Sequence, residues 1–306
     1  MRQNWVEQLE SPNQILEQLS LAACLIELWK NMYSTSTEES SNPIPFPGFV
    51  DIACGNGILV YILLTEGYKG VGYDACRRKT WTTFPAEIQK CLEERVLIPK
   101  PFADVLDLQE IGVEIHTGVF QNTFIISDHA DELTVWTPIM AALASLASPL
   151  PFFVVPCCSR SLAGSAYRYP PPGSGERKEL EQDSQPVAGD LRALRARKME
   201  EKTESGFLGS MVGSLAAKTM GIAEEIGFDV EKAWLRTPGA VNMALIGGWR
   251  TVEGIERSAS KDSVLQKITE VVERECSKDG GIHVAAKLWV ERAKSLRQGQ
   301  GMHQAN

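Results

Sequence analysis

The sequence lacks the features that would assign it to several common classes of protein. Its seven cysteines include no C-x-x-C pair, which argues against a zinc ribbon or a disulfide scaffold and favours a reducing, intracellular setting. The first ten residues are polar and do not resemble the apolar segment of a signal peptide. No apolar run approaches the ~18 residues that a membrane span requires. The sequence therefore predicts a soluble, cytoplasmic protein with no membrane segment.

The chain also lacks a net positive charge. It carries 31 lysines and arginines against 39 aspartates and glutamates, a formal charge of −8. A strongly basic chain would indicate a nucleic-acid partner by itself, and this acidic chain does not. If it binds RNA, the binding surface must be a local basic patch on an acidic body.

What the sequence does contain is an alternation of short apolar strands with helices. Such an alternation predicts a parallel sheet covered by helices on both faces. Strands are predicted at 49–52, 70–74, 96–98, 124–127 and 151–155, and helices at 12–33, 58–65, 80–95, 137–147 and 212–226. Residues 228–235 and 241–246 flank a Thr-Pro-Gly turn and predict a late antiparallel hairpin. A mostly parallel α/β sheet with an antiparallel last hairpin resembles the class I, Rossmann-like methyltransferase fold.

Composition divides the chain into three regions. Residues 1–47 hold one amphipathic helix and a polar, proline-rich linker, and residues 48–250 hold the predicted sheet. Within that second region, residues 170–206 are rich in proline, glycine, serine and charge, which predicts a disordered insertion. Residues 251–306 predict two further helices, at 262–275 and 283–296.

A glycine-rich loop after the first strand of the sheet is typical of a nucleoside-cofactor site. Glycines there allow close approach of a ligand to the backbone, and the following helix N-terminus faces it. Asp74 ends the next strand, where a carboxylate can accept hydrogen bonds from both hydroxyls of a ribose. A dehydrogenase would have a third glycine where this chain has Val60, whereas Asp51 suits a cationic amino group. The predicted cofactor-binding residues are Asp51, Ala53, Cys54, Gly55, Asn56, Gly57 and Asp74.

Several ordered blocks resemble one known family, the eukaryotic tRNA (uracil-2′-O-)-methyltransferases that act on uridine 44 of serine tRNAs. They are FVDIACGNGILVYILLTEGYKGVGYDACRRKTW, QLSLAACLIELW, SDHADELTVWTP, PFFVVPCCSRS and EEIGFDVEKAWLRTPGAVNMALIGG. The resemblance covers roughly residues 15–165 and 212–248. It implies S-adenosylmethionine as cofactor, ribose methylation as reaction and tRNA as partner. Ala53 stands where family members commonly have glycine, and alanine is tolerated there only if its φ is negative.

Two polar residues after the fourth strand are the candidates for catalysis. Methyl transfer to a ribose hydroxyl needs the nucleophile positioned and a nearby acceptor for its proton. Asp128 or His129 could serve as that base or as an orienting group. The alternative is structural: Asp131 and Glu132 cap the next helix and His129 is satisfied locally.

The adjacent cysteines Cys157 and Cys158 do not predict a metal site. Two neighbouring side chains on a strand point to opposite faces and chelate one ion badly. A nucleophilic cysteine would suit methylation of a base at carbon 5, but the family resemblance favours the ribose oxygen. We expect these cysteines to line the pocket or to be structural, and we expect no metal.

A basic cluster beside an aromatic residue is the candidate RNA-binding surface. Arg77, Arg78, Lys79 and Trp81 follow the cofactor carboxylate, and such side chains suit phosphates and an unstacked base. Arg168 borders the insertion and is expected to extend the same surface. The alternative is that the cluster is only the solvated start of a helix.

Together these features predict a tRNA 2′-O-ribose methyltransferase. Two alternatives stay open: a methyltransferase that acts on a protein or a small molecule, and a catalytically inactive methyltransferase-like subunit that binds RNA or a partner. RNA binding would separate the first alternative from the main prediction, and cofactor binding would separate the second.

Overall fold

The structure is a computed structural model that describes residues 12–33, 45–106, 114–172, 203–237, 240–252 and 260–297. Most of the predicted insertion, residues 173–202, therefore lies outside the described residues. The end of the predicted insertion is described and is helical, because helix α7 (Glu204–Gly209) begins there. The Thr203 side chain caps this helix by accepting a hydrogen bond from the Gly206 amide.

A seven-stranded sheet forms the centre of the molecule, in the order β3-β2-β1-β6-β7-β9-β8. The strands are β1 (Phe49–Ile52), β2 (Gly70–Asp74), β3 (Leu92–Glu94), β6 (Phe124–Asp128), β7 (Phe152–Val155), β8 (Val230–Thr237) and β9 (Ala240–Gly247). β1 pairs in parallel with β2 and β6, whereas β9 pairs antiparallel with both β7 and β8. The predicted class I fold, a mostly parallel sheet with an antiparallel last hairpin, is thereby confirmed. A separate two-stranded sheet joins β4 (Val96–Leu97) to β5 (Ile115–His116).

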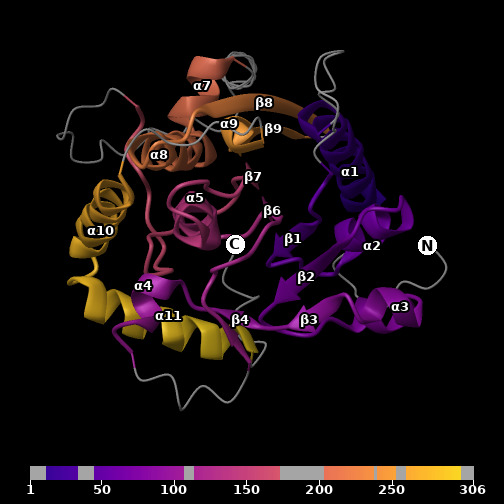
Figure 1. Cartoon of the computed structure of the whole chain (residues 1–306), viewed down its shortest axis with the longest axis horizontal. Helices are drawn as coiled ribbons and strands as arrows, with labels where there is room; N and C mark the ends of the chain where they lie inside the picture. The colour runs from indigo at the N-terminus through magenta and orange to yellow at the C-terminus, as the bar shows by residue number, and fades with distance from the viewer. Residues whose placement is uncertain are drawn as a thin grey trace, which may run out of the picture.

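Helices cover both faces of the main sheet (Figure 1). The group on the right of Figure 1 is α1 (Pro12–Tyr33), α2 (Ile58–Thr65) and α3 (Ala86–Gln89). The group on the left is α4 (Lys100–Ala103), α5 (Leu133–Ala144), α8 (Met211–Glu225), α10 (Lys261–Ser277) and α11 (Ile282–Arg297). The short α9 (Trp249–Val252) follows β9.

Each face of the sheet has its own apolar core, because successive side chains of a strand point to opposite faces. Ile125 belongs to the core that contains α5, α8, α10 and α11, whereas Phe124 and Ile126 belong to the core that contains α1 and α2. Burial on both sides explains why the central strands read as continuous apolar runs in the sequence. The terminal helices are part of these cores, since Trp29 of α1 and Trp289 of α11 are both buried.

One segment differs clearly from its predicted structure. Residues 80–95 were expected to be helical, but they form a 3₁₀ turn (Lys79–Thr83), the one-turn helix α3 and the edge strand β3. Pro85 ends the first turn because it has no amide hydrogen to donate. β3 forms the edge of the main sheet beside β2, whereas the strand predicted at 96–98 is β4, which pairs with β5 in the small sheet.

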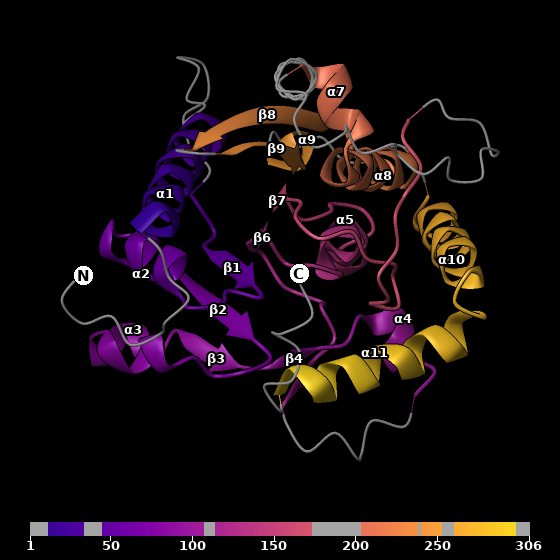
Figure 2. The same ribbon diagram turned by 180° about the vertical axis from the view of Figure 1, so that it is seen from behind.

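The last helix, α11, lies alongside α4 and next to β4 in both views of the ribbon (Figures 1 and 2). The indole Nε1 of Trp289 donates a buried 2.8 Å hydrogen bond to the carbonyl of Leu97, which ends β4. This contact brings the C-terminal region to the edge of the sheet where β1, β2 and β6 end. Within the described part of the chain, no helix combines the length and the hydropathy that crossing a bilayer would demand.

Candidate functional site

The turn from β1 into α2 is a tight backbone loop at the carboxyl edge of the sheet. Gly55 and Gly57 both have positive φ, 54° and 75°, a conformation that glycine adopts without strain. A side-chain hydrogen bond fixes the loop, because the indole Nε1 of the buried Trp81 donates at 2.9 Å to the carbonyl of Gly55. A Cβ on Gly57 would lie 3.0 Å from Leu92 and 3.2 Å from the Trp81 nitrogen. The positive φ therefore favours glycine at residue 57, and a larger residue would also have to displace Leu92 slightly.

Ala53 adopts the strained conformation that the sequence analysis expected it to avoid. Its φ is +57°, in the left-handed region where a β-carbon approaches the following carbonyl. The next residue holds it there: the Cys54 amide donates to the carbonyl of Tyr73 at 2.9 Å, which ties the loop to β2. The expectation of negative φ at this position is wrong, and alanine stands here at a cost in stability.

The carboxylate of Asp74, at the end of β2, is held in place by its neighbours. It accepts hydrogen bonds from the amides of Gly55 (2.9 Å) and Cys76 (3.0 Å), and the Arg78 guanidinium lies 3.3 Å away. Burial raises the pKa of Asp74, while Arg78 and the two amides oppose that shift. Asp74 is therefore a fixed, nearly buried acceptor directly beside the glycine loop.

Asp51 is a buried carboxylate with unmet bonding capacity next to the glycine loop. It is 2% exposed, and among the residues that the structure describes no donor reaches its Oδ1. Burial raises its pKa well above the ordinary value, and the charges of Asp128 and Asp74 raise it further. Buried polar atoms are normally satisfied, so an unpaired carboxylate oxygen points to a missing donor. A cationic amino group would satisfy this oxygen and offset the accumulated negative charge.

A cavity of about 260 Å³ opens beside Asp74 and the glycine loop. Its wall includes the glycine loop and Asp74 on one side, and Val96 and Leu97 on another. Further wall residues come from the loop after β6, from the first residue of α5 and from α11, namely His129, Ala130, Asp131, Glu132, Leu133, Trp289, Arg292, Ala293 and Leu296, and from positions at or just after the ends of neighbouring strands, namely Tyr73, Ala75, Cys76, Arg78 and Arg95. Apolar walls with a few convergent polar groups are typical of a small-molecule site. Asp74 and the glycine loop fit the nucleoside part of a ligand. The unpaired oxygen of Asp51 fits a cationic amino acid moiety on the same ligand.

The two predicted catalytic residues lie together at the end of β6. The Nδ1 of His129 is 2.7 Å from one carboxylate oxygen of Asp128, and the side chain of Gln18 donates to the other at 2.9 Å. Burial would lower the pKa of His129, but its hydrogen bond to Asp128 and that carboxylate's charge outweigh burial and raise the pKa. His129 also has positive φ, +53°, and such strain in a non-glycine residue clusters at functional sites.

The structural alternative for the next two residues is wrong in its detail. Glu132 occupies the N-cap position of α5, but its side chain makes no capping hydrogen bond. Both carboxylates instead bind arginines: Arg292 lies 3.0 Å from Asp131 and 2.7 Å from Glu132, and Arg160 lies 3.5 Å from Asp131. These ion pairs fasten α11 to the loop that carries His129.

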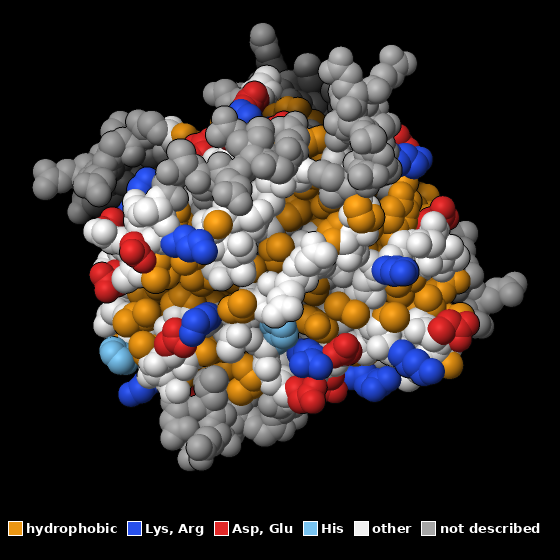
Figure 3. All heavy atoms as spheres, viewed as in Figure 1, with side chains coloured by type: hydrophobic (Ala, Val, Ile, Leu, Met, Phe, Trp, Pro, Cys, Tyr) orange, Lys and Arg blue, Asp and Glu red, His pale blue; other side chains and the backbone are white. Residues whose placement is uncertain are grey.

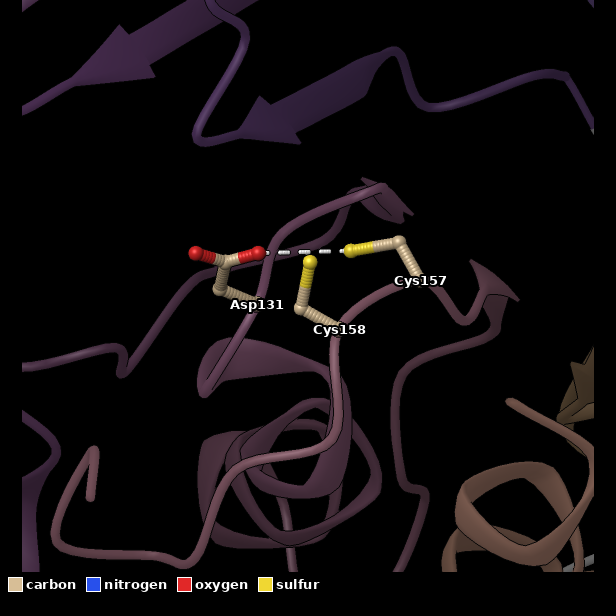
Figure 4. Close-up of side chains that lie close together, drawn as sticks. All are labelled: Asp131, Cys157 and Cys158. Carbon is tan, nitrogen blue, oxygen red and sulfur yellow. Dashed lines mark hydrogen bonds between the residues drawn. The ribbon is translucent and has the colours of Figure 1, made fainter. Parts of the chain in front are cut away.

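Cys157 and Cys158 do not point to opposite faces, because β7 ends at Val155 and both residues lie in the loop beyond it. Both thiols approach the carboxylate of Asp131, and the Sγ of Cys157 lies 3.3 Å from its Oδ1 (Figure 4). The strand geometry that argued against a shared ligand therefore does not apply. The two cysteines and Asp131 form one cluster at the rim of the cavity.

The predicted RNA-binding residues are only partly brought together. Trp81 is 0% exposed and binds the Gly55 carbonyl, so its predicted role as a stacking platform for a base is wrong. Arg78 pairs with Asp74 inside the cavity wall. Arg77 and Lys79 are exposed next to it, and Arg168 is exposed on the loop after β7. On the face in Figure 3, basic side chains lie among acidic ones, so any basic patch among the described residues there is local.

Sequence reasoning did not find the residues that reach the site from outside the sheet. Gln18 comes from α1, and Trp289 and Arg292 come from α11. The bond from Trp289 to Leu97 joins residues 192 positions apart. Helical periodicity alone marks Trp289 as a core residue, and nothing local in the sequence indicates which cavity it borders.

Comparison with known proteins gives one consistent result. A family model described as "Predicted AdoMet-dependent methyltransferase" matches residues 1–99. The tRNA (uracil-O(2)-)-methyltransferase of Aspergillus oryzae is 49% identical and aligns with 97% of this chain and 52% of its own. The protein of the same name from Neurospora crassa is 37% identical and aligns with 80% of this chain and 43% of its own. That from Schizosaccharomyces pombe is 34% identical and aligns with 87% of this chain and 47% of its own. The chain thus spans about half the length of the curated relatives it matches.

Proposed function

Because this chain belongs to the same sequence family as the fungal tRNA (uracil-O(2)-)-methyltransferases, we propose that it methylates tRNA with S-adenosylmethionine. The acceptor is the ribose 2′-hydroxyl of a uridine. The finer target that the family resemblance implies is uridine 44 of serine tRNA, in the cytoplasm. The seven free thiols of the chain fit a reducing compartment.

The observation that carries this proposal is the buried Asp51 carboxylate with an unpaired oxygen beside the glycine loop. A dinucleotide would bring a pyrophosphate to this loop, and three nearby carboxylates, Asp51, Asp74 and Asp128, would repel it. The amino group of a methionyl moiety carries the opposite charge and supplies the missing donor. The charge at this edge of the sheet therefore favours S-adenosylmethionine over a nicotinamide dinucleotide.

Asp74 and the glycine loop orient the nucleoside end. The Asp74 carboxylate is already fixed by the Gly55 and Cys76 amides, so little freedom is lost when ribose hydroxyls share it. Apolar walls from Leu97, Ala130 and Trp289 exclude water from the base. When bound, S-adenosylmethionine supplies a methyl group on a sulfonium centre, which an oxygen nucleophile accepts by in-line displacement.

Asp128 and His129 handle the proton of the acceptor hydroxyl. Hydrogen bonds from Gln18 and from the Nδ1 of His129 fix the Asp128 carboxylate, and the second bond also holds the imidazole in place. The ring is 41% exposed, so its Nε2 edge can meet a substrate hydroxyl. Neutral imidazole accepts the hydroxyl proton as the new C–O bond forms, and Asp128 stabilises the resulting imidazolium.

Arg77 and Lys79 contact the tRNA backbone. They are exposed and flank Arg78, which is part of the cavity wall, so they are the cations that would meet the phosphates next to a nucleotide bound at the cavity. Arg168 extends this surface from the loop after β7. An acidic chain needs such a concentrated set of cations to hold an RNA.

The decisive experiment incubates the protein with unmodified serine tRNA and S-adenosylmethionine carrying a labelled methyl group. Mass-spectrometric nucleoside analysis should find labelled 2′-O-methyluridine, and RNase mapping should place it at position 44. Label on a base, on another nucleoside or on the protein itself would refute the proposed acceptor. Cofactor binding by calorimetry with no labelled nucleoside would favour the inactive, RNA-binding alternative.

A further inference from the structure

We propose that Asp131, Cys157 and Cys158 form a binding site for a thiophilic divalent cation of the zinc type. Among the described residues they are the one group in which three candidate ligand atoms lie within 4.8 Å of one another (Figure 4). The proposal goes beyond methyl transfer and stands on this cluster whether or not the chain methylates RNA.

The geometry needs only small side-chain movements to close around an ion. Two sulfurs bound tetrahedrally at about 2.3 Å from zinc are roughly 3.8 Å apart. The present separations, up to 4.8 Å, exceed that value by about 1 Å, which rotation of a cysteine side chain supplies. Because Cys157 and Cys158 follow the end of β7, no pairing with another strand fixes their side chains on opposite faces.

The carboxylate of Asp131 is already oriented towards the two thiols. Its Oδ2 faces Arg292 at 3.0 Å and Arg160 at 3.5 Å, whereas its Oδ1 faces the Cys157 thiol at 3.3 Å. Carboxylate ligands of metals are commonly held in this way by a hydrogen bond on the oxygen that faces away from the ion.

The charge of the bound cation is balanced by its three ligands together with two neighbouring arginines. When M²⁺ binds, the two thiols lose their protons to solvent. The ion, the two thiolates and the carboxylate then have a net charge of −1. Arg160 and Arg292 lie next to that remaining negative charge and offset it. Metal binding displaces the protons of the two thiols, so the affinity for the cation falls as pH is lowered.

The donor set selects the type of cation. Two thiolates favour zinc or cadmium over magnesium or calcium, which prefer oxygen ligands. Three protein ligands leave one tetrahedral position for water or for another group. Of the three ligands, Asp131 is also part of the cavity wall, so a bound ion would lie next to the cavity.

The test uses the whole chain, stripped with a chelator and kept under a phosphine reductant so that no disulfide forms. Cadmium titration is followed by the ultraviolet thiolate-to-metal absorption, and zinc affinity is measured by competition with a chromophoric chelator. We expect one ion per chain and release of two protons per ion in weakly buffered solution. Magnesium at the same concentration should give no signal.

Variants locate the site. Cys157→Ser and Cys158→Ser should each weaken zinc binding at least tenfold and reduce the thiolate absorption, and Asp131→Asn should weaken binding while keeping the absorption. Cys91→Ser is the matched control, since Cys91 is also a partly buried free thiol but lies at the start of β3. It should bind zinc as the wild type does.

The wild-type titration alone can overturn the proposal, independently of whether any variant folds. Absence of thiolate absorption at a twofold excess of cadmium would do so. Equal loss of binding in Cys91→Ser, or unchanged binding in both Cys157→Ser and Cys158→Ser, would show that the ion is adventitious.

Discussion

Replacing Asp51 by asparagine should stabilise the free protein while weakening its affinity for S-adenosylmethionine. Asparagine has the same shape and removes a charge that burial and the neighbouring Asp128 and Asp74 carboxylates disfavour. Each unit by which the folded protein raises the pKa of a carboxyl corresponds to about 1.4 kcal/mol of lost stability once that carboxyl is charged. Recovering even 1 kcal/mol should raise the melting temperature of a protein of this size by about 2–4 °C.

The loss in affinity follows from the same carboxylate. A hydrogen bond to a charged group is worth about 1.5–3 kcal/mol, so the dissociation constant for the cofactor should rise roughly 10- to 150-fold. Calorimetric titration measures this change, and differential scanning calorimetry of the cofactor-free protein measures the stability. The opposite signs distinguish a ligand-binding carboxylate from one that merely supports the fold.

The pH dependence of the stability gain has a definite sign. Because the pKa of Asp51 in the folded protein is raised above the ordinary 3.8, wild-type stability falls as pH rises from 3.8 through that folded value. The advantage of Asp51→Asn should therefore be full above the folded pKa and disappear as pH falls towards 3.8.

Asp74→Asn is the matched control, because the Asp74 carboxylate already accepts bonds from two amides and pairs with Arg78. That variant should lose both stability and affinity. If Asp51→Asn also lowers the melting temperature, or binds the cofactor as tightly as the wild type, the reasoning about the unpaired oxygen fails.

Three further results are expected. Ala53→Gly should raise stability by about 0.5–1 kcal/mol in denaturant unfolding, since relief of about 1–2 kcal/mol of left-handed strain exceeds the added flexibility of the unfolded chain; a loss would mean that Ala53 is not strained. The methyl-transfer rate should rise with pH through the raised pKa of His129, where the imidazole becomes neutral, and His129→Gln should lower the rate about 10²- to 10⁴-fold and flatten that profile. Arg77→Ala with Lys79→Ala should reduce the slope of log tRNA affinity against log salt by about 0.7–0.9 per lost phosphate contact while sparing cofactor affinity; an unchanged slope in filter binding would place the RNA elsewhere.

Local pattern was sufficient to predict the half of the site that is continuous in sequence. The bounds of β1, α2 and β2 agree with the predicted 49–52, 58–65 and 70–74, because buried apolar runs there are separated by glycines and turns. The positions of Asp51 and Asp74 near one edge of the sheet follow from those predicted strands, because neighbouring parallel strands end at the same edge. Their burial and hydrogen-bond partners could not be read from the sequence.

The errors share a physical cause, which is tertiary contact that local pattern does not contain. Trp81 looked exposed beside three cations, yet its indole is committed to the Gly55 carbonyl. Ala53 was assigned the backbone that alanine prefers, but bonding between its loop and β2 imposes the other one. Cys157 and Cys158 were treated as strand residues, and β7 ends two residues too early for that.

The hydrogen bond from Trp289 to Leu97 also bears on the order in which the molecule is completed. Contacts between residues 192 positions apart form only after a large loop closes, and closing such loops slows folding. During synthesis the glycine loop and its strands leave the ribosome long before α11 does. The cavity therefore gains the wall that α11 supplies only once α11 has docked, so the recovery of cofactor binding during refolding would report when α11 docks.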